Sequence, residues 1–187
     1  SWRILREDLE ILLNGKPQVV ELGDKSSSYR QCYNALVAYG QQKQVLNQHS
    51  YWQEVSQKYE PLPVDYQSNE LPTRKQMRGY SVKLSSEQTQ QLLQQVSQVY
   101  HTEINDLLLS ALAWAVSEWS EKEYISFGLE GHGRENVVAG MDTSRTVGWF
   151  TSLFPVLLQL PDLNQLASVI KSIKEQLRTI PNRGIGY

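Results

Sequence analysis

A long apolar segment, followed almost at once by a run of β-forming residues, does most to limit the folds open to this chain. The segment over residues 103–119, EINDLLLSALAWAVSEW, is long enough for a helix and is the most apolar stretch. Residues 123–131, EYISFGLEG, are rich in β-formers and end at glycine, which is typical of a strand. Helices interleaved with strands in this way pack in layers. We therefore expect an α/β fold with a mixed sheet and packed helices, and we expect 103–119 to be buried.

Hydrophobic periodicity and turn residues predict the other elements. We expect helices within 1–15, 26–42, 47–59, 89–101 and 162–180, and strands at 79–85 and within 146–160. Helix caps are expected at Ser85 (with Gln88), at Thr102, and at Asp162 or Asn164. Helix ends are expected at Gly15 and before Pro181. Within the last strand, Pro155 indicates an edge or a bulge.

The composition argues against several classes of partner and excludes an internal disulfide. The 187 residues fit one domain of ordinary size or one lobe of a larger domain. A net charge of −2 gives no electrostatic basis for nucleic-acid binding, and no apolar run is long enough to cross a membrane. The single cysteine, Cys32, suits a reducing compartment. We expect a soluble, cytoplasmic protein with no nucleic-acid partner and no membrane partner.

The glycine-rich stretch EGHGRE, residues 130–135, is the main candidate for a functional site. A dinucleotide-binding loop needs a helix directly after its glycines to hold the phosphates, and the RENVVAGMD that follows has no helical period. A metal site needs a second histidine or a cysteine at ligand spacing from His132, and the sequence has neither. We therefore expect no metal here.

An acid or base at the end of a strand fits the same residues better. Glu130 ends the apolar run, where a carboxylate can face a cleft while its backbone stays rigid. Gly131 and Gly133 leave space for a substrate and permit positive φ. Because strand neighbours alternate between faces, Glu130 faces the cleft when the apolar residues beside it face the core. The alternative that stays open is an ion pair between Glu130 and Arg134 that only shapes a turn.

Four segments together resemble signature motifs of the epimerization domains of nonribosomal peptide synthetases. They are EGHGRE (130–135), RTVGWFTSLFPV (145–156), PNRGIGY (181–187) and, more weakly, NDLLLSALAWAV (105–116), in the family's order. The resemblance covers essentially the whole chain, because SWRILREDLE is similar to the segment just after the family's HHxxxDG motif. Ordinary condensation domains rarely carry EGHGRE or TVGWFTS, so the resemblance favours the epimerization subtype.

The resemblance implies a fold, a reaction and a set of partners. These domains belong to the condensation-domain superfamily, whose chloramphenicol-acetyltransferase-like fold has two lobes. Residues 1–187 would form a single domain fragment, the C-terminal lobe, and the N-terminal lobe with HHxxxDG would be its partner. The implied reaction epimerizes the α-carbon of an aminoacyl or peptidyl thioester from L to D. No cofactor is expected to bind directly, because a peptidyl carrier domain presents the substrate on its phosphopantetheine arm. The fragment alone is expected to be inactive.

The resemblance also implies roles for individual residues. Glu130 is expected to be catalytic, together with the second histidine of HHxxxDG, and the sequence does not decide which removes the α-proton. Burial would raise the pKa of this carboxylate from an ordinary value of roughly 4.3 toward the working pH. The residues expected to bind substrate are Gly131, His132, Arg134, Trp149 and Ser152.

Structural interpretations of these motif residues stay open beside the functional ones. His132 can turn outward or fix the loop through its ring nitrogens. Arg145 can pair with Asp142 or Glu130, and Trp149 can line the cleft or fill the core. Two alternative functions also stay open: a lobe of a peptide-bond-forming condensation domain, and a non-catalytic lobe that only docks a carrier domain.

Overall fold

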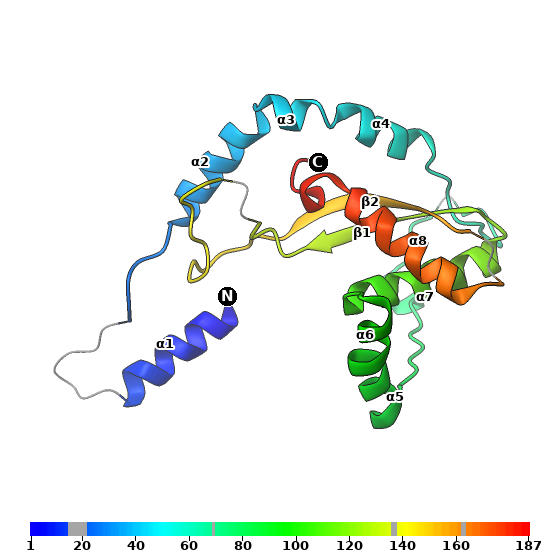
Figure 1. The fold of residues 1–187 in the computed structure, drawn as a ribbon, viewed down its shortest axis with the longest axis horizontal. Coiled ribbons are helices and arrows are strands. Elements are labelled where there is room, and N and C mark those ends of the chain that lie inside the picture. Colours follow the sequence, from blue (N-terminus) through cyan, green and yellow to red (C-terminus); the bar gives the residue numbers. More distant parts are fainter. Residues whose placement is uncertain (15–21, 69, 136–137, 162–163) are drawn as a thin grey trace. The chain divides into compact units, whose positions relative to one another are not determined.

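The computed structural model describes residues 1–14, 22–68, 70–135, 138–161 and 164–187 (Figure 1). The α-helices are α1 (Trp2–Asn14), α2 (Tyr29–Gly40), α3 (Lys43–Leu46), α4 (His49–Gln57), α5 (Ser86–Gln90), α6 (Ser97–Tyr100), α7 (Ile104–Ser120) and α8 (Leu166–Thr179). The strands are β1 (Tyr124–Gly131) and β2 (Ser152–Gln159). Between α5 and α6 lies the π-helical η2 (Gln91–Val96), and the short 3₁₀ helices are η1 (Arg74–Gln76) and η3 (Pro181–Gly184).

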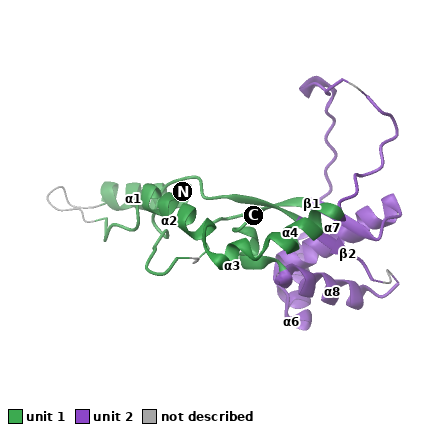
Figure 2. Ribbon diagram, turned by 90° about the horizontal axis from the view of Figure 1, so that it is seen from above, with its two compact units in different colours: residues 1–57, 128–155, 180–187 green, residues 58–127, 156–179 purple. Residues whose placement is uncertain are grey.

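Contacts within the chain divide it into two compact units (Figure 2). Unit 1 comprises Ser1–Gln57, Gly128–Pro155 and Ile180–Tyr187, and unit 2 comprises Lys58–Phe127 and Val156–Thr179. The boundary falls inside both strands, so each unit contains one half of β1 and one half of β2. The expectation of one domain over residues 1–187 stays a prediction.

The two strands pair as an antiparallel ribbon. At one end, the Leu160 N–H donates to the Glu123 carbonyl at 3.0 Å. At the other end, a Cβ placed on Gly131 would lie 2.9 Å from Ser152 Oγ. The start of one strand therefore lies beside the end of the other, and β2 continues through Pro155. The sequence predicts a mixed sheet. In the described residues, the sheet consists of this antiparallel pair.

The core of unit 2 is built from α7, α8 and the strand halves. Three residues of α8, Val169, Ile170 and Ile173, are buried, because residues three and four apart share one helix face. Ala113 on α7 is fully buried, and its small side chain leaves room for α8, with which α7 makes extensive contact. From β2, Leu158 completes this core without any exposed surface.

The sequence predicts that this apolar helix is buried. In the structure, helix α7 is buried along one face only. On its other faces, Leu112 and Trp119 are 46% and 61% exposed. Among the described residues, no helix is both long enough and apolar enough to cross a membrane.

Unit 1 is organised around α2 and the C-terminal turn. Ser28 caps α2 reciprocally: its Oγ accepts from the Gln31 N–H at 3.2 Å, and the Gln31 side chain accepts from the Ser28 N–H at 2.7 Å. Cys32 and Tyr39 turn inward from α2 and are buried. The Asn182 side chain donates to the Tyr39 hydroxyl at 2.5 Å and so holds η3 against α2.

The expected helices form, but the strand expected at 79–85 is wrong. The alternating residues Tyr80, Val82 and Leu84 are 94%, 78% and 55% exposed, and no described segment pairs with them. A strand needs a hydrogen-bonded neighbour, so a favourable pattern alone does not create one. The helix end expected at Gly15 and the candidate cap Asp162 lie outside the described residues.

One predicted cap is confirmed and another is wrong. Ser85 and Gln88 form the expected capping box, with hydrogen bonds of 2.9 and 3.1 Å. Helix α7 is capped by Glu103 and not by Thr102, since the Glu103 N–H donates to the Asp106 carboxylate at 2.9 Å. The Thr102 hydroxyl is instead buried without a hydrogen-bond partner.

Candidate active site

Strand β1 carries Glu130 to the point where the strand ends. Leu129 is partly buried and Glu130 is exposed, as the alternation of strand neighbours predicts. Among the described residues, the Glu130 carboxylate makes no hydrogen bond and no ion pair. The alternative pairing with Arg134 is therefore wrong, and the carboxylate is free to act on another molecule. The sequence predicts a buried carboxylate, but the described residues leave Glu130 exposed.

His132 fixes the loop that follows Glu130. Its Nδ1 accepts a hydrogen bond from the Arg134 N–H at 3.0 Å, and its Nε2 lies 3.3 Å from Glu135 Oε1. Both ring nitrogens are therefore used within EGHGRE, which confirms the expectation that they hold the loop. The His132 side chain remains 63% exposed, and its role in substrate binding stays a prediction.

Gly133 and Arg134 attach this loop to the segment that precedes β2. Gly133 is buried with φ +64°, and a Cβ there would overlap the carbonyl of Phe150. The Arg134 guanidinium donates to the Thr143 carbonyl and, at 2.8 Å, to the Thr146 carbonyl. Its carbon Cζ also lies 4.0 Å from the centroid of the Phe150 ring. Arg134 thus supports the loop, and substrate binding by its remaining N–H groups stays a prediction.

The segment 142–149 is also bound to the residues just before α2. The Ser27 N–H donates to the Asp142 carbonyl at 2.8 Å, and the Thr146 hydroxyl donates to the Ser27 carbonyl at 2.6 Å. Hydrogen bonds from the backbone N–H and side chain of Ser144 lower the pKa of the Asp142 carboxyl. These contacts give the segment a defined path although it is neither helix nor strand.

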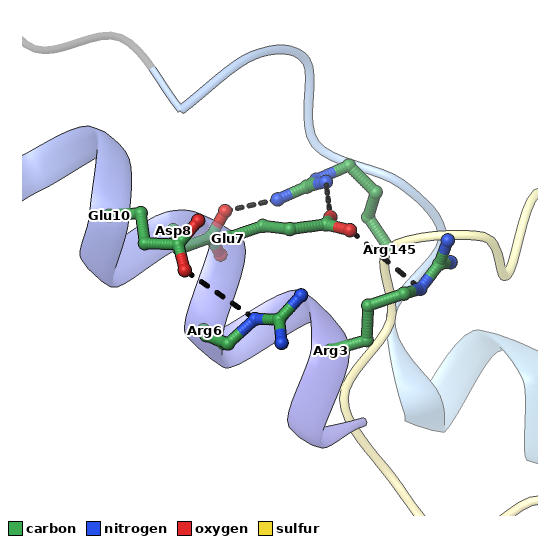
Figure 3. Close-up of polar contacts among 6 residues, drawn as sticks. All are labelled: Arg3, Arg6, Glu7, Asp8, Glu10 and Arg145. Carbon is green, nitrogen blue, oxygen red and sulfur yellow. Dashed lines mark hydrogen bonds and ion pairs between the residues drawn. The ribbon is translucent and has the colours of Figure 1, made fainter.

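Arg145 pairs with α1, so the expected partners Asp142 and Glu130 are wrong (Figure 3). Its Nη1 lies 3.2 Å from Glu7 Oε2, and its Nη2 contacts Asp8 Oδ1. Both partners lie more than 130 residues away in the sequence, so the local motif could not reveal them.

The remaining predicted site residues lie on the same segment and at the start of β2. Trp149 is 78% exposed, while Phe150 is half-buried and packs edge-on against Tyr29 with ring centroids 5.1 Å apart. Trp149 therefore does not fill the core. Ser152 and Gly131 lie opposite each other across the ribbon, so β1 and β2 bring the start of EGHGRE and the end of TVGWFTS together. Substrate binding by these residues stays a prediction.

The C-terminal turn contributes a contact that sequence reasoning missed. Arg183 Nη1 lies 3.8 Å from Glu135 Oε1, the oxygen that also faces His132. Asn182 and Arg183 both adopt left-handed backbone conformations, with φ of 45° and 52°. Such a conformation is uncommon for residues other than glycine. The sequence signals a turn through its glycines, but it does not signal this contact.

The site offers one uncommitted carboxylate on a well-supported loop. Such a group can remove a proton from a substrate or return one to it. The described residues contain no group of three or more His, Cys, Asp or Glu side chains arranged to hold a metal ion. Two shallow pockets lie elsewhere: one of about 400 Å³ is lined by residues within 117–123 and 160–161, and one of about 370 Å³ by residues within 84–94.

The sequence and fold place this chain in a known family. The sequence-family model of the condensation domain matches residues 1–187, so the chain belongs to the condensation-domain family. Tyrocidine synthase 1 of Brevibacillus parabrevis is 42% identical over 100% of the chain, and bacitracin synthase 2 of Bacillus licheniformis is 41% identical over 100%. The chain spans 18% and 7% of these two relatives.

Solved structures confirm the α/β fold class and the resemblance on which it rests. The epimerization domain from the third module of tyrocidine synthetase B is 38% identical over 100% of this chain, with a TM-score of 0.87. The chain covers 42% of that structure. The first condensation domain of the calcium-dependent antibiotic synthetase has a TM-score of 0.68 over 97% of this chain at 16% identity, which shows the fold alone.

Proposed function

We propose that these residues form the Glu130 side of an epimerization active site in a nonribosomal peptide synthetase. The intact domain inverts the α-carbon of an aminoacyl or peptidyl thioester carried on a phosphopantetheine arm. The observation that carries the proposal is the free, exposed carboxylate of Glu130, beside His132 and Arg134, whose side chains support the loop. The 38% identity to a solved epimerization domain favours this subtype.

The proposed chemistry needs a proton donor and a proton acceptor on opposite faces of the α-carbon. One group removes the α-proton, the electron pair moves into the thioester carbonyl as an enolate, and a second group returns a proton to the other face. Glu130 supplies one group, and the histidine of HHxxxDG, implied by resemblance, supplies the other. When the carrier-bound substrate covers Glu130, the carboxylate loses its contact with water and becomes a stronger base.

The function is tested by Glu130→Gln in the intact domain. The substrate is an aminoacyl thioester on its carrier domain in D₂O, and α-deuteration is followed by mass spectrometry. We expect the exchange rate to fall by at least about 100-fold, because removal of a general acid or base typically costs 10²–10⁴-fold. Carrier binding should be unchanged, since the amide keeps the size and shape of the carboxylate.

Two controls make the outcome specific. Glu123→Gln removes a carboxylate just before β1 and should leave exchange unchanged, because Glu123 contacts Gln159 and not the EGHGRE loop. His132→Ala should loosen the loop and reduce exchange less than Glu130→Gln. Full exchange in Glu130→Gln, or its loss in His132→Ala alone, would contradict the assignment. Peptide-bond formation by the intact domain without α-exchange would point to a condensation lobe.

A further inference from the structure

Segment 145–149 is bound to three other parts of unit 1. The first is α1, through Arg145. The second is the EGHGRE loop, through the bond from Arg134 to the Thr146 carbonyl. The third is the start of α2, where the Tyr29 hydroxyl donates to the Trp149 carbonyl at 2.7 Å. These long-range contacts fix the position of a segment that is neither helix nor strand.

The contact with α1 uses both terminal nitrogens of the Arg145 guanidinium (Figure 3). Each nitrogen faces a different carboxylate, Glu7 at 3.2 Å and Asp8 in direct contact. These three side chains are 35%, 36% and 26% exposed, so they are partly shielded from water. A planar guanidinium held at both ends has a fixed orientation, which a single ammonium group would not have.

The backbone next to Trp149 is held as well. Ser1 Oγ donates to the Gly148 carbonyl at 2.9 Å and lies 3.2 Å from the Gly148 N–H. A Cβ on Gly148 would overlap the ring of Tyr29, so this backbone lies directly against that ring. The Trp149 indole is nevertheless 78% exposed. A large aromatic side chain is thus presented to solvent from a backbone that is fixed at several points.

We propose that the ion pairs of Arg145 with Glu7 and Asp8 form a clasp that positions Trp149 to contact the carrier-bound thioester substrate. Arg145 is then a positioning residue that acts through Trp149. This inference rests on the proposed function. An exposed indole supplies a large, rigid apolar contact surface for an acyl chain or its pantetheine arm.

A purely structural ion pair makes a different prediction from a positioning clasp. Partly exposed ion pairs contribute little to stability, so their loss hardly changes the folded population. Displacement of a substrate-contacting residue, in contrast, weakens substrate binding. The decisive measurement is therefore the KM for a carrier-bound aminoacyl thioester supplied in trans, with kcat and the melting temperature recorded for each variant.

The variants are made in the intact domain. Both Arg145→Gln and the double change Glu7→Gln/Asp8→Asn should raise KM by about 10-fold, with a smaller change in kcat, because misplacement by about 1 Å can cost up to 100-fold. Arg145→Lys should recover only part of the loss, since one ammonium cannot face both carboxylates. Trp149→Ala should raise KM by a similar factor, and its combination with Arg145→Gln should be no worse than the larger single effect.

Arg6→Gln is the matched control. Arg6 pairs with Glu10 on the same helix at 3.5 Å (Figure 3). In the described part of the chain no hydrogen bond or ion pair joins Arg6 to segment 145–149, so KM should not change. An unchanged KM in Glu7→Gln/Asp8→Asn would overturn the clasp. Effects of Arg145→Gln and Trp149→Ala that multiply in the double variant would overturn it as well. Glu130→Gln is measured in parallel. If this variant keeps α-exchange, the proposed function itself fails. If it loses α-exchange while the Arg145 variants keep the original KM, only the clasp is rejected.

Discussion

At the scale of single residues, Gly133 shows how the EGHGRE loop depends on a missing side chain. Its φ of +64° lies in the left-handed region, and its Cα lies so close to the Phe150 carbonyl that a Cβ would overlap it. The sequence predicts the first property from the glycine itself. It does not predict the second, because the approach of Phe150 is a tertiary contact.

Gly133→Ala should therefore destabilise the protein more than a glycine substitution that meets only the backbone penalty. We expect a loss of roughly 3 kcal/mol or more in the free energy of unfolding, since strain and overlap add. Gly140→Ala is the matched control: its φ is +79°, and apart from its chain neighbours no described residue has an atom within 4 Å of the added Cβ. The control should cost only about 1–2 kcal/mol. Urea denaturation of both variants tests this, and equal losses would contradict it.

The candidate site was predictable at residues whose position follows from local periodicity. Glu130 is exposed at the end of β1 because strand neighbours alternate, and His132 uses its ring nitrogens within its own loop. The partners of Arg134 and Arg145 were not predictable. Arg145 finds its carboxylates on a helix distant in sequence, and Arg134 binds backbone carbonyls, which every residue carries.

At the scale of elements, helices were easier to predict than strands. A helix satisfies its own backbone hydrogen bonds, so periodicity and a cap such as Ser28 are sufficient to locate α2. A strand depends on a neighbour that the local sequence does not specify, which explains why 124–131 forms a strand and 79–85 does not. Near α7, either Thr102 or Glu103 has a suitable side chain, and the reciprocal bond with Asp106 decides for Glu103.

Helix α1 carries an apolar stripe that the described residues leave exposed. Trp2, Leu9 and Leu13 are 86%, 56% and 82% exposed, while Ile4 on another face is buried. Contiguous apolar surface of this kind promotes association. We expect the 187-residue chain to self-associate with rising concentration, and Leu9→Lys/Leu13→Lys to reduce that association in sedimentation velocity.

A charge-matched pair separates apolar contact from simple charge repulsion. Ser56→Lys/Gln57→Lys adds the same charge at exposed positions of α4 and should leave the association unchanged. Sedimentation as a monomer at all concentrations, or equal effects of the two pairs, would contradict a role for the α1 stripe.

At the scale of the whole molecule, the proposed reaction needs more than this chain supplies. Inversion of an α-carbon requires two proton-transferring groups on opposite faces, and the described site offers one free carboxylate, which is exposed to water. The chain spans 42% of the solved epimerization domain to which it is similar. The second group and the walls that would exclude water are therefore expected from the remainder of the domain.

The 187-residue chain alone should accordingly not catalyse α-exchange, although the intact domain should. A carboxylate that is exposed to water is a weak base, and the described residues place no second group to return a proton to the opposite face. The measurement is α-deuteration of a carrier-bound aminoacyl thioester in D₂O, with buffer alone as the background and the intact domain as the positive control. We expect the chain and its Glu130→Gln variant to match the buffer rate. Exchange above that rate in the chain, abolished by Glu130→Gln, would show that one lobe is sufficient and that Glu130 works without the proposed histidine.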